Sequence, residues 1–566
     1  MNHLARVSGA LVVIFAAANG AVQAEPAHKS LGDLSKVGTV NFPISCAPGT
    51  QKDFDRAVAL LHSFFYDEAR RSFESIVARD PKCGIAHWGV AMTLYHPVWA
   101  APSEEELKLG LAAANTALTV GAKTPRELGY INAVRAFYTS TLPSDGVAGE
   151  SCHGLVGTDH RGRALAYEKV MEKLQADYPK DVEAKIFYAL ALLGTAPPGD
   201  PALTNQTKAA AIMEPLFAKF QNHPGLAHYL IHAYDYPSTA ARGLPAAKSY
   251  AAMAPWVPHA LHMPSHIFTR LGMWQEAVDA NLASADAARS YAASRYPGSA
   301  SFEELHALDY LVYAYLQTGH TAKAKEALDR TYAIGKTFPE VDFVVAYAAG
   351  AIPARFALER RQWAEAAKLP LQQPTLWGKF PFAEAHLEFA HAVGAARSGN
   401  AALARKAAER LQALADKIPQ ADPKFQFFTK QVRMQQLAAT GWVAYAEGKK
   451  EEALKILRTA ADAEDKLGKH PVSPGAIYPV RELLGDLLVE LKRPADALVE
   501  YEASLKIYPA RFNGLYGAGY SAELAGQKDL ANKYYKALVA LAAGDNSRVE
   551  VGHAKEFLAS SGAQRL

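Results

Sequence analysis

Histidines are concentrated in one short stretch of the chain. Five of the 19 histidines lie between residues 228 and 266 of a 566-residue sequence. His228, His232 and Asp235 occupy positions i, i+4 and i+7, which places them on one stripe of a helix. Neutral imidazole is the commonest metal ligand, and an H-x3-H step on a helix is a common half of a metal site. The stretch therefore predicts a candidate metal-binding face.

A second stripe follows in the segment "PHALHMPSHIF". His259, His262 and His266 are spaced at i, i+3 and i+7, and Pro264 is expected to kink or begin their helix. Histidine together with carboxylate suits Zn, Cu, Fe or Ni. The pattern is not the HExxH motif of zinc proteases, because Tyr229 stands where that motif has its glutamate. A divalent transition metal is thus a possible cofactor, and no catalytic motif is recognised.

A structural role is the alternative interpretation. Histidines on such helices also hydrogen-bond backbone carbonyls, stack on aromatic rings or contact a bound peptide. Tyrosine and tryptophan side chains, among them Tyr229, Tyr234 and Trp256, are close in sequence. Residue types and spacing alone leave both interpretations open.

The elements that position these histidines are helical repeats. A 34-residue spacing relates three pairs of residues near the C-terminus: Gly485 and Gly519, Ala497 and Ala531, Tyr501 and Tyr535. These offsets resemble the tetratricopeptide (TPR) repeat, in which small residues let helix B approach helix A and a large residue fills the groove. We therefore predict an all-α, right-handed superhelical solenoid of antiparallel helix pairs.

The repeat phase places the histidines on A helices. Segment 239–253 is expected to be a B helix, so the first stripe lies on the A helix before it. "QEAVDAN", from Gln275, is the next B helix and follows the second stripe. The A helix after that carries Glu303 and His306. Successive A helices line the concave groove with axes about 8–10 Å apart, so imidazoles from neighbouring helices can meet there.

One groove pocket is the resulting expectation. His228, His232, His262 and His266 are expected to converge there, with Asp235 or Glu303 orienting a ligand or acting as a general base. The full candidate set is His228, His232, His259, His262, His266, His306, Asp235 and Glu303.

The domain organisation follows from the same periodicity. Residues 45–566 are expected to form one solenoid, preceded by an extended segment 25–44. Pro/Gly-rich stretches near 141–160, 195–206 and 468–479 are interpreted as long connections between helix pairs.

Four segments, "HWGVAMTLYHPVW", "HYLIHAYDYP", "HALHMPSHIFTRLGMWQEAVDAN" and the C-terminal repeats, resemble a family of exported bacterial TPR proteins. "HMPSHI" is the most specific piece. The resemblance spans about residues 45–535, while the early "HPVW" segment and the 141–160 connection match poorly. It implies the solenoid fold and singles out the same histidines, and it supplies no reaction.

The N-terminus is typical of a cleavable signal peptide. Arg6 precedes an apolar run from Val7 to Ala21, and Val22-Gln23-Ala24 forms a small-x-small cleavage site before Glu25. The run is shorter than a spanning helix needs, and no later stretch is apolar enough to span a membrane. We expect residues 1–24 to be removed and the mature protein to be periplasmic or secreted.

The cysteines fit an oxidising compartment. The chain has three, Cys46, Cys83 and Cys152, and no CxxC pair. Cys46 should precede the first A helix and Cys83 should begin the second, at the same edge of the solenoid. We predict a Cys46–Cys83 disulfide with Cys152 free.

Composition and the absence of known motifs argue against several classes of function. Lys+Arg total 60 against 57 Asp+Glu, so no basic surface indicates nucleic acid. No nucleophile, phosphate-loop or dinucleotide motif is present. Two functions stay open: a scaffold that binds a protein or peptide in its concave groove, and a metalloprotein, either a metal-handling factor or an enzyme, with its metal in that groove.

Overall fold

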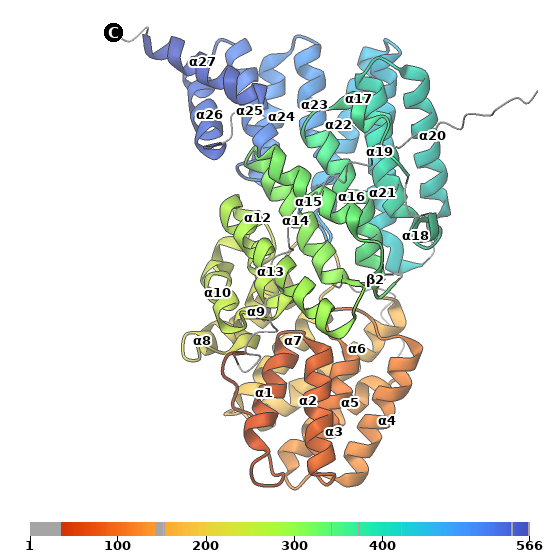
Figure 1. Ribbon diagram of the computed structural model, residues 1–566, viewed down its shortest axis with the longest axis vertical. Coiled ribbons are helices and arrows are strands. Elements are labelled where there is room, and N and C mark those ends of the chain that lie inside the picture. The colour runs from red at the N-terminus through yellow and green to blue at the C-terminus, as the bar shows by residue number, and fades with distance from the viewer. Residues whose placement is uncertain are drawn as a thin grey trace, which may run out of the picture.

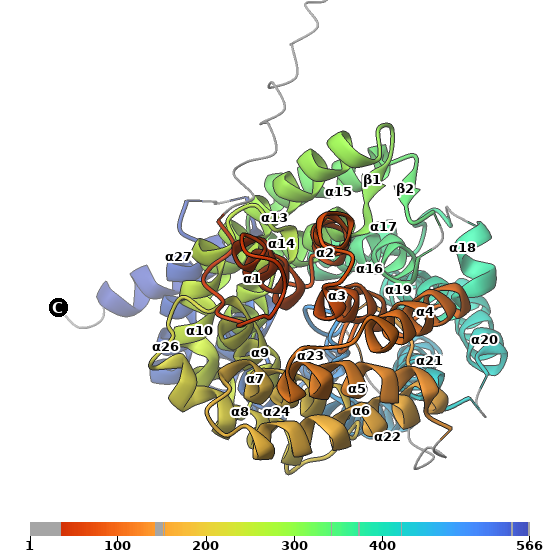
Figure 2. The same cartoon turned by 90° about the horizontal axis from the view of Figure 1, so that it is seen from below.

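The computed structural model describes residues 36–141, 151, 153–340, 342–371, 374–419, 422–544 and 547–563. The predicted signal segment 1–24 and Cys152 lie outside these residues. Nearly every described element is a helix, and Figures 1 and 2 show the helices winding around the long axis of the molecule. The prediction of an all-α solenoid of helix pairs is confirmed.

The first part of the solenoid follows the non-helical segment 36–49. Its helices are α1 (Gln51–His62), α2 (Tyr66–Arg79), α3 (Gly84–Tyr95), α4 (Glu104–Val120), α5 (Pro125–Thr139), α6 (Thr158–Asp177), α7 (Val182–Gly194), α8 (Thr204–Phe217), α9 (Pro224–Tyr234) and α10 (Ala240–Met253).

The middle part contains α11 (Pro258–His262), α12 (Pro264–Leu271), α13 (Trp274–Arg295), α14 (Phe302–Gln317), α15 (Thr321–Ala333), α16 (Phe343–Glu359), α17 (Trp363–Ala366) and α18 (Pro374–Lys379). Two-residue strands β1 (Ala300–Ser301) and β2 (Thr337–Phe338) pair in parallel beside α13 and α14.

The C-terminal part consists of α19 (Pro381–Arg397), α20 (Ala401–Lys417), a 3-10 turn η1 (Pro423–Phe425), α21 (Gln426–Ala446), α22 (Lys450–Leu467), α23 (Val480–Glu490), α24 (Pro494–Ile507), α25 (Phe512–Leu524), α26 (Lys528–Leu541) and α27 (Val549–Ala563). No helix among the described residues has the length and apolar character needed to cross a membrane.

The 34-residue repeat has a direct packing basis. A Cβ on Gly485 would lie 2.7 Å from Tyr501 Cε2, and one on Gly519 would lie 2.7 Å from Tyr535 Cδ1. In both pairs the tyrosine of helix B therefore packs directly on the glycine of helix A. Ala497 and Ala531 are fully buried at the start of the B helices, as the repeat predicts.

The superhelix is tightly wound. Helix α1 contacts α9, and α14 contacts α25, although each pair is far apart in sequence. Buried Arg511, which precedes α25, binds Glu482 at 2.7 Å and Glu359 at 2.8 Å, and donates to Tyr313 on α14. These contacts bring successive turns together around the axis.

A connection crosses the inner side of the solenoid. Between α22 and α23, residues 468–479 are non-helical and reach α14, where the Tyr310 hydroxyl lies 3.3 Å from Pro471 O and 3.1 Å from Ser473 O. Lys469 of this connection binds Asp235 at 2.9 Å. The inner face near the histidines is therefore covered by chain, where an open groove was expected.

Cys46 and Cys83 form a disulfide at the ends of the first helix pair. The predicted pairing of these two cysteines is confirmed.

Candidate metal centre

The structure gathers the histidines into two clusters. The first contains His228, His232 and His259, and the second contains His262, His266 and His306. Within each cluster, one ring nitrogen from every histidine lies within 4.8 Å of one ring nitrogen from each of the other two. We call them the first triad and the second triad. All six side chains come from A helices, namely α9, α11, α12 and α14.

The first triad is built around His228. Its Nδ1 lies 2.7 Å from the backbone carbonyl oxygen of His62, at the end of α1, and must donate a proton to it. In the neutral ring, Nε2 is then unprotonated. His228 Nε2 lies 3.0 Å from Nε2 of His259 and 3.0 Å from Nε2 of His232. A single lone pair on His228 therefore faces two further ring nitrogens.

The second triad repeats this arrangement. His262 Nδ1 lies 2.7 Å from Asn281 Oδ1, which accepts, since the Asn281 amide donates to Ala277 O. His266 Nδ1 donates to Asp235 Oδ2 at 2.9 Å. With both Nδ1 protons committed, the two Nε2 atoms are unprotonated, and they lie 3.1 Å apart.

The protonation state follows from burial. His228, His262 and His266 are at most 2% exposed. Burial lowers the pKa of His228 and of His262 well below the ordinary histidine value, and it lowers the pKa of His266 although Asp235 opposes the shift. The rings are therefore neutral at pH 7. Of the two facing acceptors, His266 Nε2 has the Tyr310 hydroxyl 3.5 Å away, which is a long hydrogen bond. A buried acceptor left without a donor costs about 1–3 kcal/mol, and a bound cation would remove that cost.

The spacing suits a shared metal ion. Bonds of about 2.0–2.1 Å meeting at roughly tetrahedral or square angles place two nitrogen ligands about 2.9–3.4 Å apart. The Nε2 separations of 3.0 and 3.1 Å in the triads fall in this range. All-imidazole ligands suit Zn, Cu, Fe or Ni, whereas Mg and Ca prefer oxygen.

Asp235 orients His266 and is itself held by cations. It contacts Arg270 at 2.8 Å and Lys469 at 2.9 Å. Against the effect of burial, these two charges keep the pKa of Asp235 well below its usual value. Carboxylate-to-histidine hydrogen bonds of this kind fix the tautomer of a metal ligand and increase its basicity.

A third cluster consists of His62, Glu183 and His223, which are joined by hydrogen bonds. Glu183 accepts from His62 Nε2 and from His223 Nε2, both at 2.9 Å. The remaining nitrogens accept from the Tyr229 hydroxyl and from the Leu226 amide. Every ring nitrogen has a complementary partner, so this cluster needs no ion and holds α1 against α9. The second triad differs from it, because there two acceptors, His262 Nε2 and His266 Nε2, face each other.

Several expectations require correction. The four histidines expected in one pocket divide between the two triads, because His228 meets His259 and His262 meets His306. The groups nevertheless adjoin: the ring centroids of His259 and His262 are 6.5 Å apart. Five of the six imidazoles are buried and only His232 is partly exposed, so they do not line an open groove.

Glu303 does not join these histidines. It belongs to neither triad, and burial together with the negative charge of Asp67 raises the pKa of its carboxyl to about 8. It lies in the first turn of α14, one turn before His306. The charge that affects its carboxyl comes from Asp67 on α2.

His153 was not predicted from the sequence. It lies in the connection before α6 and is 5% exposed. Its ring stacks on Trp99 with centroids 3.9 Å apart, and neither ring nitrogen has a hydrogen-bond partner among the described residues. A lone histidine in an irregular segment has no periodicity that could have singled it out.

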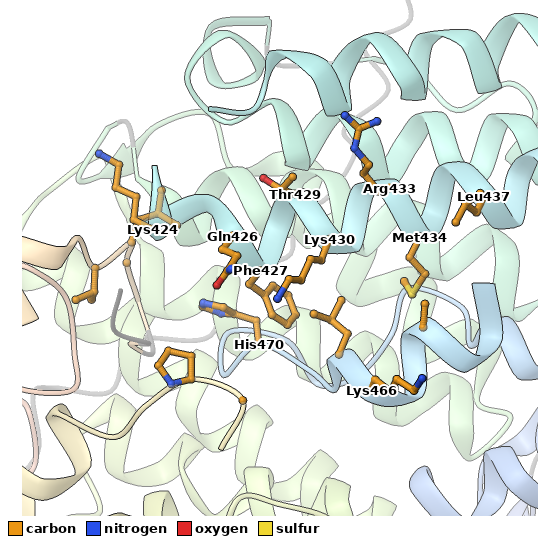
Figure 3. Close-up of a pocket in the computed structure, with 17 residues that line it drawn as sticks. Lys424, Gln426, Phe427, Thr429, Lys430, Arg433, Met434, Leu437, Lys466 and His470 are labelled. Atoms are coloured by element: carbon orange, nitrogen blue, oxygen red, sulfur yellow. The ribbon is translucent and has the colours of Figure 1, made fainter. Parts of the chain in front are cut away.

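Two cavities lie near these clusters. One of about 370 Å3 is lined by His232, Asp235, Arg270 and Lys469, and therefore reaches the first triad. Another, of about 500 Å3, lies beside α21 and the end of α22 (Figure 3). Its basic lining residues are Lys424, Lys430, Arg433 and Lys466; its apolar ones include Phe427 and Met434.

The chain matches no protein-family model and no curated protein sequence. Similar solved structures include an IFIT1 monomeric mutant with Gppp-AAAA, at 13% identity over 90% of this chain and 99% of that one, with a TM-score of 0.36. Yeast Tom70 has 11% identity over 85% and 98% of the two chains, and a TM-score of 0.31. The TPR domain of P58(IPK) has 14% identity over 67% and 99%, and a TM-score of 0.21. Because these TM-scores are low, the assignment of a helical solenoid rests on the helix pairs of this chain itself.

Proposed function

We propose that this chain is an exported metalloprotein whose solenoid holds first-row transition-metal ions in the two histidine triads. The observation that carries the proposal is the His262–His266 pair, in which two buried, neutral imidazoles point unprotonated Nε2 atoms at each other across 3.1 Å. A shared cation is the simplest partner for both. Three ligands per triad leave a coordination position for water or substrate, as in catalytic rather than structural zinc sites.

The solenoid supplies rigidity for such a site. The triad residues come from four helices, α9, α11, α12 and α14. Partners from α1, α13 and the α9–α10 turn set the tautomers of His228, His262 and His266. Because these helices pack against one another, the ligands are positioned before an ion binds. That preorganisation favours tight binding.

The test is metal content of the untagged mature protein, measured by elemental analysis after exposure to Zn, Cu, Fe and Ni. We expect tightly held metal in the wild type and its loss in a His262→Gln, His266→Gln double variant, with helix content unchanged by circular dichroism. His87→Gln, a partly exposed histidine on α3, is the matched control and should keep its metal. A wild-type protein that never retains metal would contradict the proposal.

Export is part of the same proposal and rests on the N-terminal sequence pattern. We expect cleavage before Glu25, which N-terminal sequencing of the native protein checks. A retained Met1 would contradict it.

Peptide binding is a second candidate function, favoured by the cavity of Figure 3. Its lining contains four basic side chains and no carboxylate, whereas the chain as a whole is nearly balanced at 60 basic and 57 acidic residues. Lys424 and Arg433 pair with Asp422 and Asp416. A basic rim over apolar side chains would suit an acidic peptide that carries apolar anchors.

A labelled peptide of alternating glutamate and phenylalanine tests this candidate by fluorescence anisotropy. We expect a Lys430→Glu, Lys466→Glu variant to bind at least tenfold more weakly than the wild type. Lys455→Glu, on the exposed face of α22, is the charge-matched control. Equal binding by all three proteins would exclude this cavity as the peptide site.

A further inference from the structure

The cavity of about 370 Å3 has two cations and one carboxylate in the buried part of its lining. Arg270 on α12 binds Asp235 at 2.8 Å, and Lys469 of the 468–479 connection binds the same carboxylate at 2.9 Å. The side chains of Arg270 and Lys469 are 8% and 2% exposed, and that of Asp235 is 12% exposed. One carboxylate balances only one of the two charges, and a buried charge is costly unless a counter-charge meets it.

The other carboxylates that line this cavity among the described residues do not correct the imbalance. Asp465 binds Arg481 at 2.6 Å, and Asp200 accepts from the backbone amides of Ala202 and Thr204, each at 2.9 Å. The exposed side chain of Lys466 adds a further positive charge to the lining. The cavity therefore favours an anion.

A buried amide in the same lining also lacks a partner. Gln206 on α8 is 6% exposed, and its Nε2 donates to the Tyr236 hydroxyl at 2.8 Å. Its Oε1 has no hydrogen-bond partner among the described residues. Because a hydroxyl both donates and accepts, a ligand hydroxyl would satisfy this amide whichever way the amide is turned.

Size and charge narrow the class of ligand. A volume of about 370 Å3 lies within the range of small-molecule sites. An excess of one positive charge at Arg270 and Lys469 matches a monoanion better than a phosphate dianion, and a planar carboxylate is the natural partner of a guanidinium group. Leu193 and Leu203 add apolar surface to the lining, which suits the carbon chain of such a molecule.

We propose that this cavity binds a small hydroxylated monocarboxylate, with its carboxylate beside Arg270 and Lys469 and a hydroxyl at Gln206. The inference goes beyond the proposed metal-binding function and does not require an ion. His232 of the first triad also lines the cavity, so the bound molecule would lie beside that triad.

Isothermal titration calorimetry with gluconate tests the proposal on the full mature chain, both as purified and after dialysis against EDTA. We expect one saturable site in both preparations. Glucose lacks the charge of gluconate and hexanoate lacks its hydroxyls, so each should bind at least about tenfold more weakly. Absence of gluconate binding in both preparations overturns the inference whatever the metal content, which elemental analysis measures separately.

Other outcomes of the titration would also contradict the proposal. Binding that disappears after EDTA treatment would show that gluconate binds an ion and that the cavity alone does not recognise it. Equal binding of hexanoate and gluconate would remove the role of the hydroxyl. Tighter binding of glucose 6-phosphate than of gluconate would replace the carboxylate with a phosphate.

Two variants locate the site. Lys469→Met removes the excess charge and should weaken gluconate binding about tenfold. Gln206→Leu should weaken gluconate binding and leave hexanoate binding unchanged, a difference that a general loss of structure would not produce. Lys455→Met, on the exposed face of α22, is the control and should bind as the wild type does. Wild-type affinity in both cavity variants overturns the assignment. If circular dichroism shows that Lys469→Met is unfolded, Gln206→Leu decides.

Discussion

His266 Nδ1 donates to Asp235 Oδ2 at 2.9 Å, and on the other side of the same ring Nε2 faces His262. The carboxylate therefore fixes which nitrogen of His266 is available to an ion. Its negative charge also increases the basicity of that nitrogen.

Asp235→Asn should weaken metal binding about 10- to 100-fold, because the amide keeps the shape of the carboxylate and loses its charge. Competition with a chromophoric chelator measures the affinity. Asp200→Asn, which lines the same cavity but caps a loop through the Ala202 and Thr204 amides, is the control and should bind as the wild type does. Equal affinities for all three proteins would remove Asp235 from the centre.

Gly485→Ala should destabilise the C-terminal repeats by about 1–3 kcal/mol, since its Cβ would lie 2.7 Å from buried Tyr501. Gly552→Ala, on α27, meets nothing within 4 Å and should be neutral or stabilising by up to about 1 kcal/mol. Urea unfolding followed by circular dichroism compares them. Similar midpoints for the two variants would argue against tight packing at the repeat contact.

His386 should make the fold acid-sensitive. Burial lowers its pKa to about 3 from an ordinary 6.5. Below pH 6.5 the unfolded chain takes up a proton that the folded chain refuses, so stability falls progressively between pH 6.5 and about 3. The loss at pH 5 amounts to about 2 kcal/mol. His386→Gln should lose about that much less than the wild type between pH 7 and pH 5, measured by urea unfolding. Identical pH dependence would show that His386 is not the source.

Removal of the disulfide should cost about 3–4 kcal/mol, because Cys46 and Cys83 are 37 residues apart and the cross-link restricts the unfolded chain. A Cys46→Ser, Cys83→Ser variant should melt at a lower temperature than the oxidised wild type. A reducing agent should lower the wild-type melting temperature to the same value and leave the variant unaffected. A wild type that is insensitive to reductant would contradict this prediction.

Much of the architecture is encoded locally. The spacing of Gly485 and Tyr501 predicts a helix pair, because the tyrosine of helix B packs on the glycine of helix A. The same contact recurs one repeat later between Gly519 and Tyr535. The phase of those pairs placed segment 239–253 on a B helix, where α10 is found, and the histidine stripes on A helices. Helical periodicity likewise puts His228 and His232 on one face, and the ends of the first two A helices brought Cys46 and Cys83 together.

The grouping of the histidines was decided by the tertiary structure. His228 is oriented by the carbonyl of His62, 166 residues earlier, and that contact exists only because the superhelix returns α1 to α9. The same winding covers the inner face with the 468–479 connection and brings His153 beside His306. Glu303 lies one turn from His306 and still belongs to a different environment. Residue spacing specifies the face of a helix on which a side chain lies, whereas the pitch of the superhelix, a sum of small rotations between pairs, determines what that face meets.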